Sequence, residues 1–311
     1  MSAQRILVVG GSGFVGGRLL RLAMARGVAV ASFGPGEAPR EDGVARFDGR
    51  AEVPGELLRA LREFRPDALI WAAGHNPGGD GLARSATEDP ARAVAVNAGG
   101  FAAALAAAAV AEVGRVVQCG STVVYGPPAL YGTARVDEAA PPAPRSTYGL
   151  SKHMAEMAAD WAAHALGLSV TTLRLPLVLG PGRWYVGAAA LHARMLRAAA
   201  GGAPFDDAVP DTPFDAVHGD DAAEALLMLA GLPQAPRRLN MAGLTLDHAG
   251  IAAALERIAG PGRVAARAVQ TPAELPLVDD SALRGLGWQP RHDLEAILTD
   301  TLREMMSKES A

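Results

Sequence analysis

A glycine-rich turn near the start of the chain constrains the fold more than any other feature. Residues 6–9 form a short apolar, β-branched run without alternation, which predicts a strand buried on both faces. Glycines follow at positions 10, 13 and 16, and the amphipathic residues 19–24 then predict a helix that ends near Gly27. A strand, a tight turn and a helix are typical of parallel α/β sheets, in which the helix N-terminus can bind a pyrophosphate. The alternative is a βα turn that binds no ligand.

The glycine spacing, GxxGxxG rather than GxGxxG, resembles that of the extended short-chain dehydrogenases/reductases, the group that contains the NAD-dependent epimerase/dehydratase family. The resemblance implies a doubly wound parallel α/β sheet (Rossmann fold) with a smaller C-terminal α/β substrate-binding part. We expect the dinucleotide-binding domain at 1–176, with 212–242 returning to it, and the substrate-binding part at 177–211 and 243–311. The turn residues expected to bind the cofactor are Gly10, Ser12, Gly13, Phe14, Val15 and Gly16.

Composition excludes several classes of protein. The 311 residues carry a net charge of −4 without a basic block, which argues against a nucleic-acid partner. The longest apolar run, 101–111, is too short to cross a bilayer, so we expect no membrane partner. The chain enters a strand without a secretory pattern, so we expect a cytoplasmic protein. Cys119 is the single cysteine, which excludes an internal disulfide, and we expect no metal site.

The strongest catalytic signal is the spacing of Tyr148 and Lys152. Residues four apart share one face of a helix, so the phenol and the ammonium can enter one site. Only two of the 29 cationic residues are lysines and four residues are tyrosines, so this pair is not expected by chance. A phenol with a pKa near about 10 is a poor base at neutral pH, and a nearby ammonium lowers that pKa. The alternative is a surface i,i+4 pair.

A second catalytic segment comes earlier, at Ser121-Thr-Val-Val-Tyr-Gly. It resembles the Ser-Ser-x-x-Val-Tyr-Gly segment of the same family, which implies that Ser121 contacts the reacting oxygen of the substrate. A serine hydroxyl can hydrogen-bond an oxygen that gains or loses a proton as hydride moves. We therefore predict Tyr148, Lys152 and Ser121 as the catalytic residues.

The second strand decides between NAD and NADP. NAD-binding relatives carry an acidic residue at its end, which holds the ribose hydroxyls, but Gly34 stands at the matching position. The nearby Arg40 suits a 2′-phosphate, so the cofactor is NAD or NADP with a slight preference for NADP. Alternatively, Glu37 holds the ribose. Asp48 matches an aspartate that contacts the adenine in the resembling family; a simple turn aspartate is the alternative.

Other positions complete the predicted site by resemblance. The small residues after the fourth strand leave room for the dinucleotide, Asn97 braces neighbouring strands at the cofactor edge, and the backbone after Pro176 passes the nicotinamide. These further cofactor positions are Ala72, Ala73, Gly74, Asn97 and Pro176. The candidate substrate residues are His75, Thr122, Leu177 and Arg183.

The substrate half departs from the nucleotide-sugar members of the family. Leu177 replaces an asparagine and Phe214 replaces an arginine that contact the substrate diphosphate there. The Asp-Glu pair of 4,6-dehydratases is absent after Ser121. We therefore expect an NAD(P)-dependent oxidoreductase that transfers hydride between the cofactor and a secondary alcohol or ketone of a small polar substrate, a sugar or hydroxy acid. The alternatives are a nucleotide-sugar epimerase with tightly bound NAD and a non-catalytic dinucleotide sensor.

Two helices suggest the quaternary structure. The alanine-rich stretch 89–113 predicts one long helix, and the helix that carries Tyr148 has an apolar stripe at Met154, Met157 and Trp161. Related proteins dimerise through a four-helix bundle of such helices, so we expect a homodimer; ordinary core packing is the alternative. Further on, Asp220 and Asp221 precede a predicted helix, so N-capping accounts for one of them.

Overall fold

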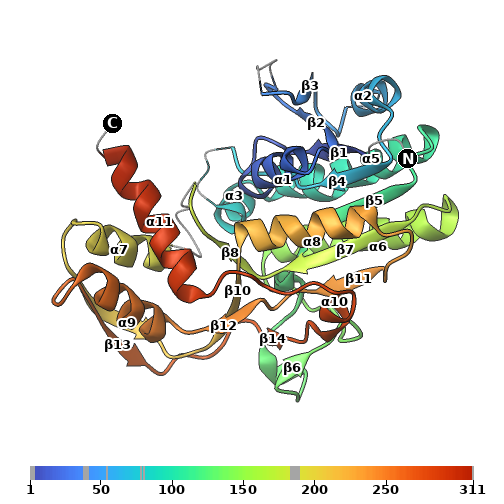
Figure 1. Ribbon diagram of the computed structural model, residues 1–311. Coiled ribbons are helices and arrows are strands. Elements are labelled where there is room, and N and C mark those ends of the chain that lie inside the picture. Colours follow the sequence, from blue (N-terminus) through green and yellow to red (C-terminus); the bar gives the residue numbers. More distant parts are fainter. Residues whose placement is uncertain are drawn as a thin grey trace.

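The computed structural model describes residues 4–37, 42–53, 55–77, 79, 81–182 and 190–309. Its centre is a seven-stranded, entirely parallel sheet with the strand order β11-β7-β5-β4-β1-β2-β3 (Figure 1). The order reverses at β1, which is the signature of a doubly wound sheet, so the predicted fold class is confirmed. The strands are β1 (Arg5–Val9), β2 (Ala29–Gly34), β3 (Ala45–Asp48), β4 (Ala68–Trp71), β5 (Arg115–Ser121), β7 (Val170–Leu175) and β11 (Arg238–Asn240).

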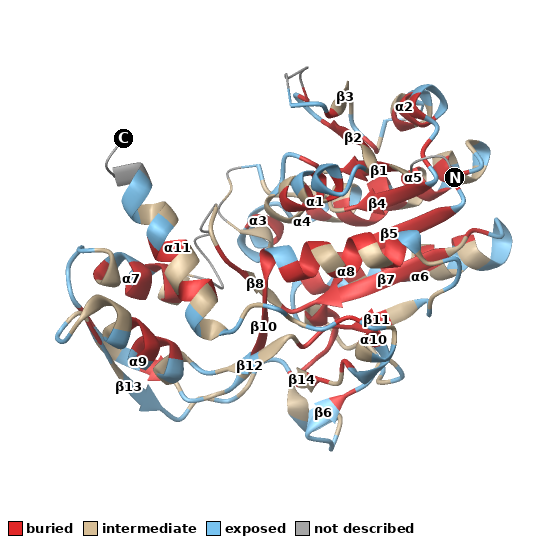
Figure 2. Ribbon diagram, in the orientation of Figure 1, coloured by how far each residue is buried: buried red, intermediate tan, exposed pale blue. Residues whose placement is uncertain are grey.

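Helices cover both faces of this sheet, and the central strands are buried throughout (Figure 2). Alternate residues of β1 enter two separate apolar cores: Ile6 and Val8 face one, Leu7 and Val9 the other. This explains why the strand is apolar at every position. The first core is closed by α1 (Phe14–Ala25) and α8 (Gly219–Gly231), and the second by α2 (Glu56–Phe64), α5 (Phe101–Val110) and α6 (Thr147–Ala165).

The helix expected at 89–113 is interrupted. It consists of α4 (Pro90–Val94), a π-helical turn over Ala95–Gly100 and α5. The turn brings the backbone close to the sheet, because a Cβ at Gly100 would lie 3.3 Å from the Trp71 ring. By length and composition alone, Pro90–Val110 could cross a membrane, with a mean hydropathy of 1.8, and 44% of it is buried. A core helix of a soluble protein can have the same length and hydropathy.

A smaller α/β part lies beside the carboxyl edge of the sheet (Figure 1). Its elements are β8 (Leu177–Leu179), α7 (Ala190–Ala199), β9 (Phe205–Pro210), β10 (Phe214–His218), β12 (Leu244–Leu246), α9 (His248–Ala259), β13 (Val264–Val269) and α11 (Leu294–Glu309). Strand β10 pairs with β8 and β12, outside the large sheet. By contrast, β11 is an edge strand of the large sheet, and α8 packs against that sheet. The remaining short elements are α3 (Leu82–Glu88), β6 (Arg135–Val136), β14 (Leu277–Val278) and α10 (Ser281–Gly285).

One strand of this part has no local sequence signal. The stretch 201–213 is rich in glycine and proline, which favour a loop, but it contains β9. This strand pairs in parallel with β13, so that Phe205 lies opposite Val264. The pairing partner is far away in the sequence, and the local pattern therefore does not reveal the strand.

Candidate active site

The glycine turn packs against the exit of β4. Gly10 has φ +87°, and a Cβ there would lie 2.8 Å from the Ala73 backbone; at Gly16 a Cβ would lie 2.2 Å from the Gly10 carbonyl oxygen. Both positions therefore require glycine. The N-cap of α1 is Gly13, which has no side chain to accept a hydrogen bond from the first N–H groups of the helix. Ser12 and Gly13 are exposed. An exposed helix N-terminus at the reversal point of the strand order fits the pyrophosphate of a dinucleotide.

At the end of β2, the nearest acid faces inward. Glu37 is buried, and its two carboxylate oxygens accept hydrogen bonds from Ser32 Oγ at 2.8 Å and from an Arg46 guanidinium nitrogen at 2.9 Å. The exposed Asp48 carboxylate instead accepts from the Gly36 backbone N–H at 2.7 Å. Glu37 is thus a structural ion-pair partner. Arg40 lies outside the described residues.

Helix α6 holds Tyr148 and Lys152 against β5. The helix starts at Ser146, whose side chain accepts a hydrogen bond from the Gly149 N–H at 3.0 Å. Lys152 is 3% exposed, and its Nζ atom donates to the Cys119 carbonyl oxygen at 2.8 Å. The same Nζ lies 5.8 Å from the centre of the Tyr148 ring. The two side chains thus share the buried face of α6, as their spacing predicts.

Ser121 is the last residue of β5, two residues beyond Cys119. Its hydroxyl accepts a long hydrogen bond, 3.4 Å, from the Val123 N–H, and the residue is 8% exposed. Helix α6 packs tightly on the 3₁₀ turn that follows, Thr122–Val124, because a Cβ at Gly149 would lie 2.3 Å from the Val123 carbonyl oxygen. This close approach brings the start of α6 to the end of β5. Thr122 is buried in the same turn.

Burial shapes the charges of this site. Desolvation lowers the pKa of the Lys152 ammonium, and the charge of the Glu156 carboxylate acts in the opposite direction. Burial raises the pKa of the Cys119 thiol to about 12, so this thiol stays neutral at neutral pH. One turn beyond Lys152, Glu156 forms a buried two-pronged ion pair with Arg174, at 2.8 and 2.7 Å. This pair joins α6 to β7 and was not predicted, since its partners lie on separate elements.

Asn97 links the exit of β4 to α6. Its Oδ1 accepts from the His75 backbone N–H at 2.8 Å, and its Nδ2 donates to Ser151 Oγ at 2.9 Å. Ser151 in turn donates to the Tyr148 carbonyl oxygen at 2.8 Å. Asn97 therefore has both polar atoms engaged with protein groups. Ala72, Ala73 and Gly74 lie beside it, half-buried.

Leu177 and Phe214, which replace the expected diphosphate contacts, lie on two paired strands, β8 and β10. Leu177, half-buried, begins β8 directly after Pro176 and lies opposite Ala216 of β10. Phe214 packs against two imidazole rings, His192 at 5.4 Å and His248 at 4.9 Å. Arg183 lies outside the described residues.

The expected capping role of Asp220 or Asp221 is wrong. His218 is the N-cap of α8, and its ring accepts from the Asp220 N–H. Asp220 pairs with the buried Arg18 at 2.5 Å, and Asp221 binds His292. Neither carboxylate caps the helix, because each binds a partner that is distant in the sequence, Arg18 or His292.

Comparisons with known proteins agree with this architecture. The sequence model of the NAD dependent epimerase/dehydratase family matches residues 6–242. A dTDP-6-deoxy-L-talose 4-dehydrogenase (NAD(P)(+)) of Kitasatospora kifunensis is 28% identical, covering 98% of this chain and 96% of that protein. A UDP-glucose 4-epimerase of Azospirillum brasilense is 27% identical, covering 97% and 92%.

Solved structures give the same result. The Thermus thermophilus UDP-glucose 4-epimerase in complex with NAD has a TM-score of 0.80 and 26% identity, covering 97% of this chain and 98% of that one. The glycine turn, the parallel sheet and the Tyr148–Lys152 pair all agree with the match of the family model over three quarters of the chain. The chain belongs to the NAD dependent epimerase/dehydratase family.

Proposed function

We propose that this protein is an NAD(P)-dependent dehydrogenase or reductase that acts on a secondary alcohol or ketone of a small polar substrate, a sugar or a hydroxy acid. The observation that carries the proposal is the position of Lys152, whose Nζ is held by the Cys119 carbonyl two residues before Ser121 and beside the Tyr148 ring. A sensor that only bound a dinucleotide would need none of these proton-transfer groups.

The three side chains have distinct roles in the proposed reaction. When bound at the glycine turn, a nicotinamide dinucleotide would supply the hydride acceptor or donor. In the oxidative direction, the Tyr148 phenolate accepts the proton of the substrate hydroxyl, and in the reductive direction the phenol returns it. The Lys152 ammonium favours the phenolate by its charge, and Ser121 donates a hydrogen bond to the same substrate oxygen.

We propose NADP as the preferred cofactor. The absence of a carboxylate at Gly34 and the inward orientation of Glu37, bonded to Ser32 and Arg46, support this choice. Among the described acids next to the end of β2, Asp42 pairs with Arg46, and Asp48 is engaged with the Gly36 N–H. The matched dehydrogenase relative is named for both dinucleotides.

A nucleotide-sugar epimerase is the second candidate, favoured by the epimerase relative and the epimerase structure. In this chain Leu177 and Phe214 occupy the positions expected to contact a diphosphate. The packing of Phe214 on His192 and His248 supports an apolar surface there, which cannot pair with a phosphate charge.

A thermal-shift panel separates the two candidates. NAD, NADP, UDP, GDP and TDP are tested singly, and each diphosphate is then tested with the preferred dinucleotide. A ligand that binds only the folded protein raises the melting temperature. We expect a shift from NADP and none from the diphosphates, followed by turnover of NADP or NADPH in a screen of sugars and hydroxy acids. A clear added shift from a diphosphate would instead establish the nucleotide-sugar candidate.

A further inference from the structure

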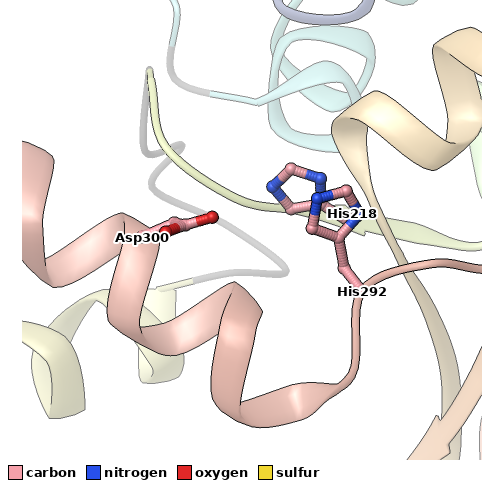
Figure 3. A group of neighbouring side chains, drawn as sticks. All are labelled: His218, His292 and Asp300. Atoms are coloured by element: carbon pink, nitrogen blue, oxygen red, sulfur yellow. The ribbon is translucent and has the colours of Figure 1, made fainter.

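Three ligand-type side chains meet where α11 lies beside the β10–α8 junction. His218 ends β10, His292 lies in the segment before α11, and Asp300 lies on α11 (Figure 3). One ligand atom of each residue lies within 4.8 Å of the others. In Figure 3 the Asp300 carboxylate points toward the His218 ring, and the two imidazoles overlap; their centres are 3.9 Å apart. The group could not be predicted from the sequence, because Asp300 follows His218 by 82 positions.

His292 is already oriented as a ligand. Its Nδ1 lies 3.0 Å from Asp221 Oδ1, and its backbone N–H donates to Asp221 Oδ2 at 3.1 Å. A carboxylate that accepts the Nδ1 proton fixes the tautomer of an imidazole and leaves the Nε2 lone pair free. Histidine metal ligands almost always donate their other ring N–H to a carboxylate, a backbone carbonyl or water, and Asp221 supplies such an acceptor here.

His218 presents a buried atom without a protein partner. The residue is 2% exposed, and its Nε2 makes no hydrogen bond with the described part of the chain. Leaving such a buried atom without a partner destabilises the folded state. The Nδ1 atom of His218 accepts the Asp220 N–H at 3.2 Å. A metal at Nε2 requires the proton on Nδ1, so metal binding would break this cap and turn Nδ1 toward Asp220 Oδ2, 3.9 Å away.

The surroundings favour a cation. A cavity of about 480 Å³ adjoins the group and is lined by Pro181, His218, Asp220, Asp300, Arg303, Glu304 and Ser307. Among the described charges, four carboxylates (Asp220, Asp221, Asp300 and Glu304) face two guanidiniums, Arg18 and Arg303. Arg18 is neutralised by Asp220 at 2.5 Å. Arg303, 72% exposed, pairs with Asp300 at 2.8 Å and can be displaced into solvent.

We propose that His218, His292 and Asp300 form a binding site for one divalent transition-metal ion of the zinc class. Two imidazole nitrogens and one carboxylate oxygen suit such an ion, with the fourth position open to water from the cavity. Tetrahedral coordination at about 2.0–2.1 Å requires ligand atoms roughly 3.3 Å apart, so the group must contract by about 1.5 Å. Asp300, with a side chain 37% exposed, can move toward the histidines. The two imidazole rings, whose planes are 31° apart, must also turn so that both planes meet at the ion.

The ion would tie the C-terminal helix to the cofactor-binding sheet. Asp300 moves with α11, which packs on α9, whereas His218 belongs to the β10–α8 junction, and α8 packs on α1 and on the sheet. A metal bound only in the folded state stabilises it by its binding free energy. The site would thus brace the two parts of the fold and is independent of the proposed hydride transfer.

The test is zinc binding by the full, untagged chain after treatment with EDTA and gel filtration. Isothermal titration with Zn²⁺ should give one site per chain, and zinc should raise the melting temperature. Asp300→Asn and His292→Asn should each weaken zinc binding by about tenfold or more. Co²⁺ should give the visible absorption bands of a low-coordinate ion, and they should be lost in Asp300→Asn.

Matched controls separate this site from binding elsewhere. Glu295→Gln makes the same charge change on the same helix, and His164→Asn removes an exposed imidazole; both should bind zinc as the unaltered protein does. Circular dichroism checks that all variants are folded, and Asp300→Asn, at a partly exposed position, keeps the test available should His292→Asn unfold. The proposal is overturned by the absence of one saturable site, or by equal affinity in Asp300→Asn and the unaltered chain.

Discussion

The Nζ atom of Lys152 lies 2.8 Å from the carbonyl oxygen of Cys119, so the helix that carries Tyr148 is bound directly to the strand that ends in Ser121. The bond is buried and charge-assisted, and it fixes the ammonium beside the phenol. Desolvation lowers the pKa of Lys152, so the ammonium depends on this carbonyl and on the Glu156 carboxylate to stay charged. The position of the proposed base is therefore set by the packing of α6 on β5.

Replacement of Tyr148 by Phe removes the proposed proton acceptor and keeps the ring. Because Phe fills nearly the same volume, dinucleotide affinity should stay within about twofold, while kcat falls by about 10²–10⁴. Fluorescence titration with NADPH and steady-state rates on the substrate found by the screen measure the two quantities. Near-normal turnover would contradict the assignment of Tyr148, whatever the substrate.

Replacement of Gly34 by Asp should reverse the cofactor preference. A Cβ at Gly34 would lie 3.7 Å from the nearest Glu37 atom, an ordinary contact, so a side chain fits. The new carboxylate would repel a 2′-phosphate and accept hydrogen bonds from ribose hydroxyls. We expect NADPH binding to weaken by about tenfold or more, equivalent to roughly 1.4 kcal/mol, and NADH binding to strengthen.

Gly34→Ala is the matched control, because it adds the Cβ without the charge. It should leave the ratio of NADPH to NADH affinity unchanged in fluorescence titrations. If the Ala variant loses NADPH as the Asp variant does, the effect is steric. If the unaltered chain prefers NADH, the proposed NADP preference is wrong.

The sequence predicted those parts of the molecule that depend on local chemistry. The glycines at 10 and 16 are required by contacts within and next to one turn, and Tyr148 and Lys152 by one helix face, so their spacing alone was informative. The large sheet followed from the alternation of apolar strands and helices.

Features made by distant partners could not be predicted in this way. Strand β9 exists through its pairing with β13, and Asp221 left its expected capping role for His292, which follows 71 residues later. Glu37 was considered as a ribose ligand, but its orientation is set by Arg46 from the next strand. In each case the local sequence specifies the residue type, and the tertiary fold decides which partner it meets.

Exposed apolar residues on α6 support the expected homodimer, in which a second copy would cover them. Leu150, Met154, Met157 and Trp161 follow one another at helical spacing, and Met157 is 59% and Trp161 52% exposed. In the neighbouring apolar segment Pro90–Val110, 44% of the most apolar 18-residue window is buried. Contiguous apolar surface of this kind is typical of an interface.

Met157→Glu together with Trp161→Glu should therefore convert the protein into a monomer. Two carboxylates in the centre of an apolar interface would lose their hydration, whereas both positions are exposed in the single chain and tolerate charge. Light scattering after gel filtration should give twice the chain mass of 31.9 kDa for the unaltered protein and that mass once for the variant. Met306→Glu, 56% exposed on α11, is the control and should remain dimeric. A monomeric unaltered protein would refute the interface.

His192 is an acid-sensitive point in the small part of the fold. The residue is 3% exposed, and neither ring nitrogen has a hydrogen-bond partner among the described residues. Its ring stacks on His248 at 5.0 Å. Burial, with a smaller effect of the His248 charge, lowers the pKa of His192 from 6.5 to about 4. Between these two values the unfolded chain binds a proton that the folded chain excludes, so this residue's contribution to stability falls as the pH drops from 6.5 toward 4.

Replacement of His192 by Phe should remove that loss, because a phenyl ring keeps the stack and has no proton to bind. At pH 5 the unaltered residue is expected to cost about 2 kcal/mol of folding stability relative to neutral pH, because its pKa falls from 6.5 in the unfolded chain to about 4 in the folded one. Urea unfolding at pH 7 and pH 5 measures the free energy of unfolding directly. The fall between the two values should be smaller in His192→Phe by about that amount, although His248, whose pKa burial also lowers, keeps part of the acid sensitivity. His164→Asn, which changes an exposed imidazole, should retain the full fall. An equal fall in His192→Phe and the unaltered chain would show that His192 gains its proton in the folded state, and hence that the stack opens to water.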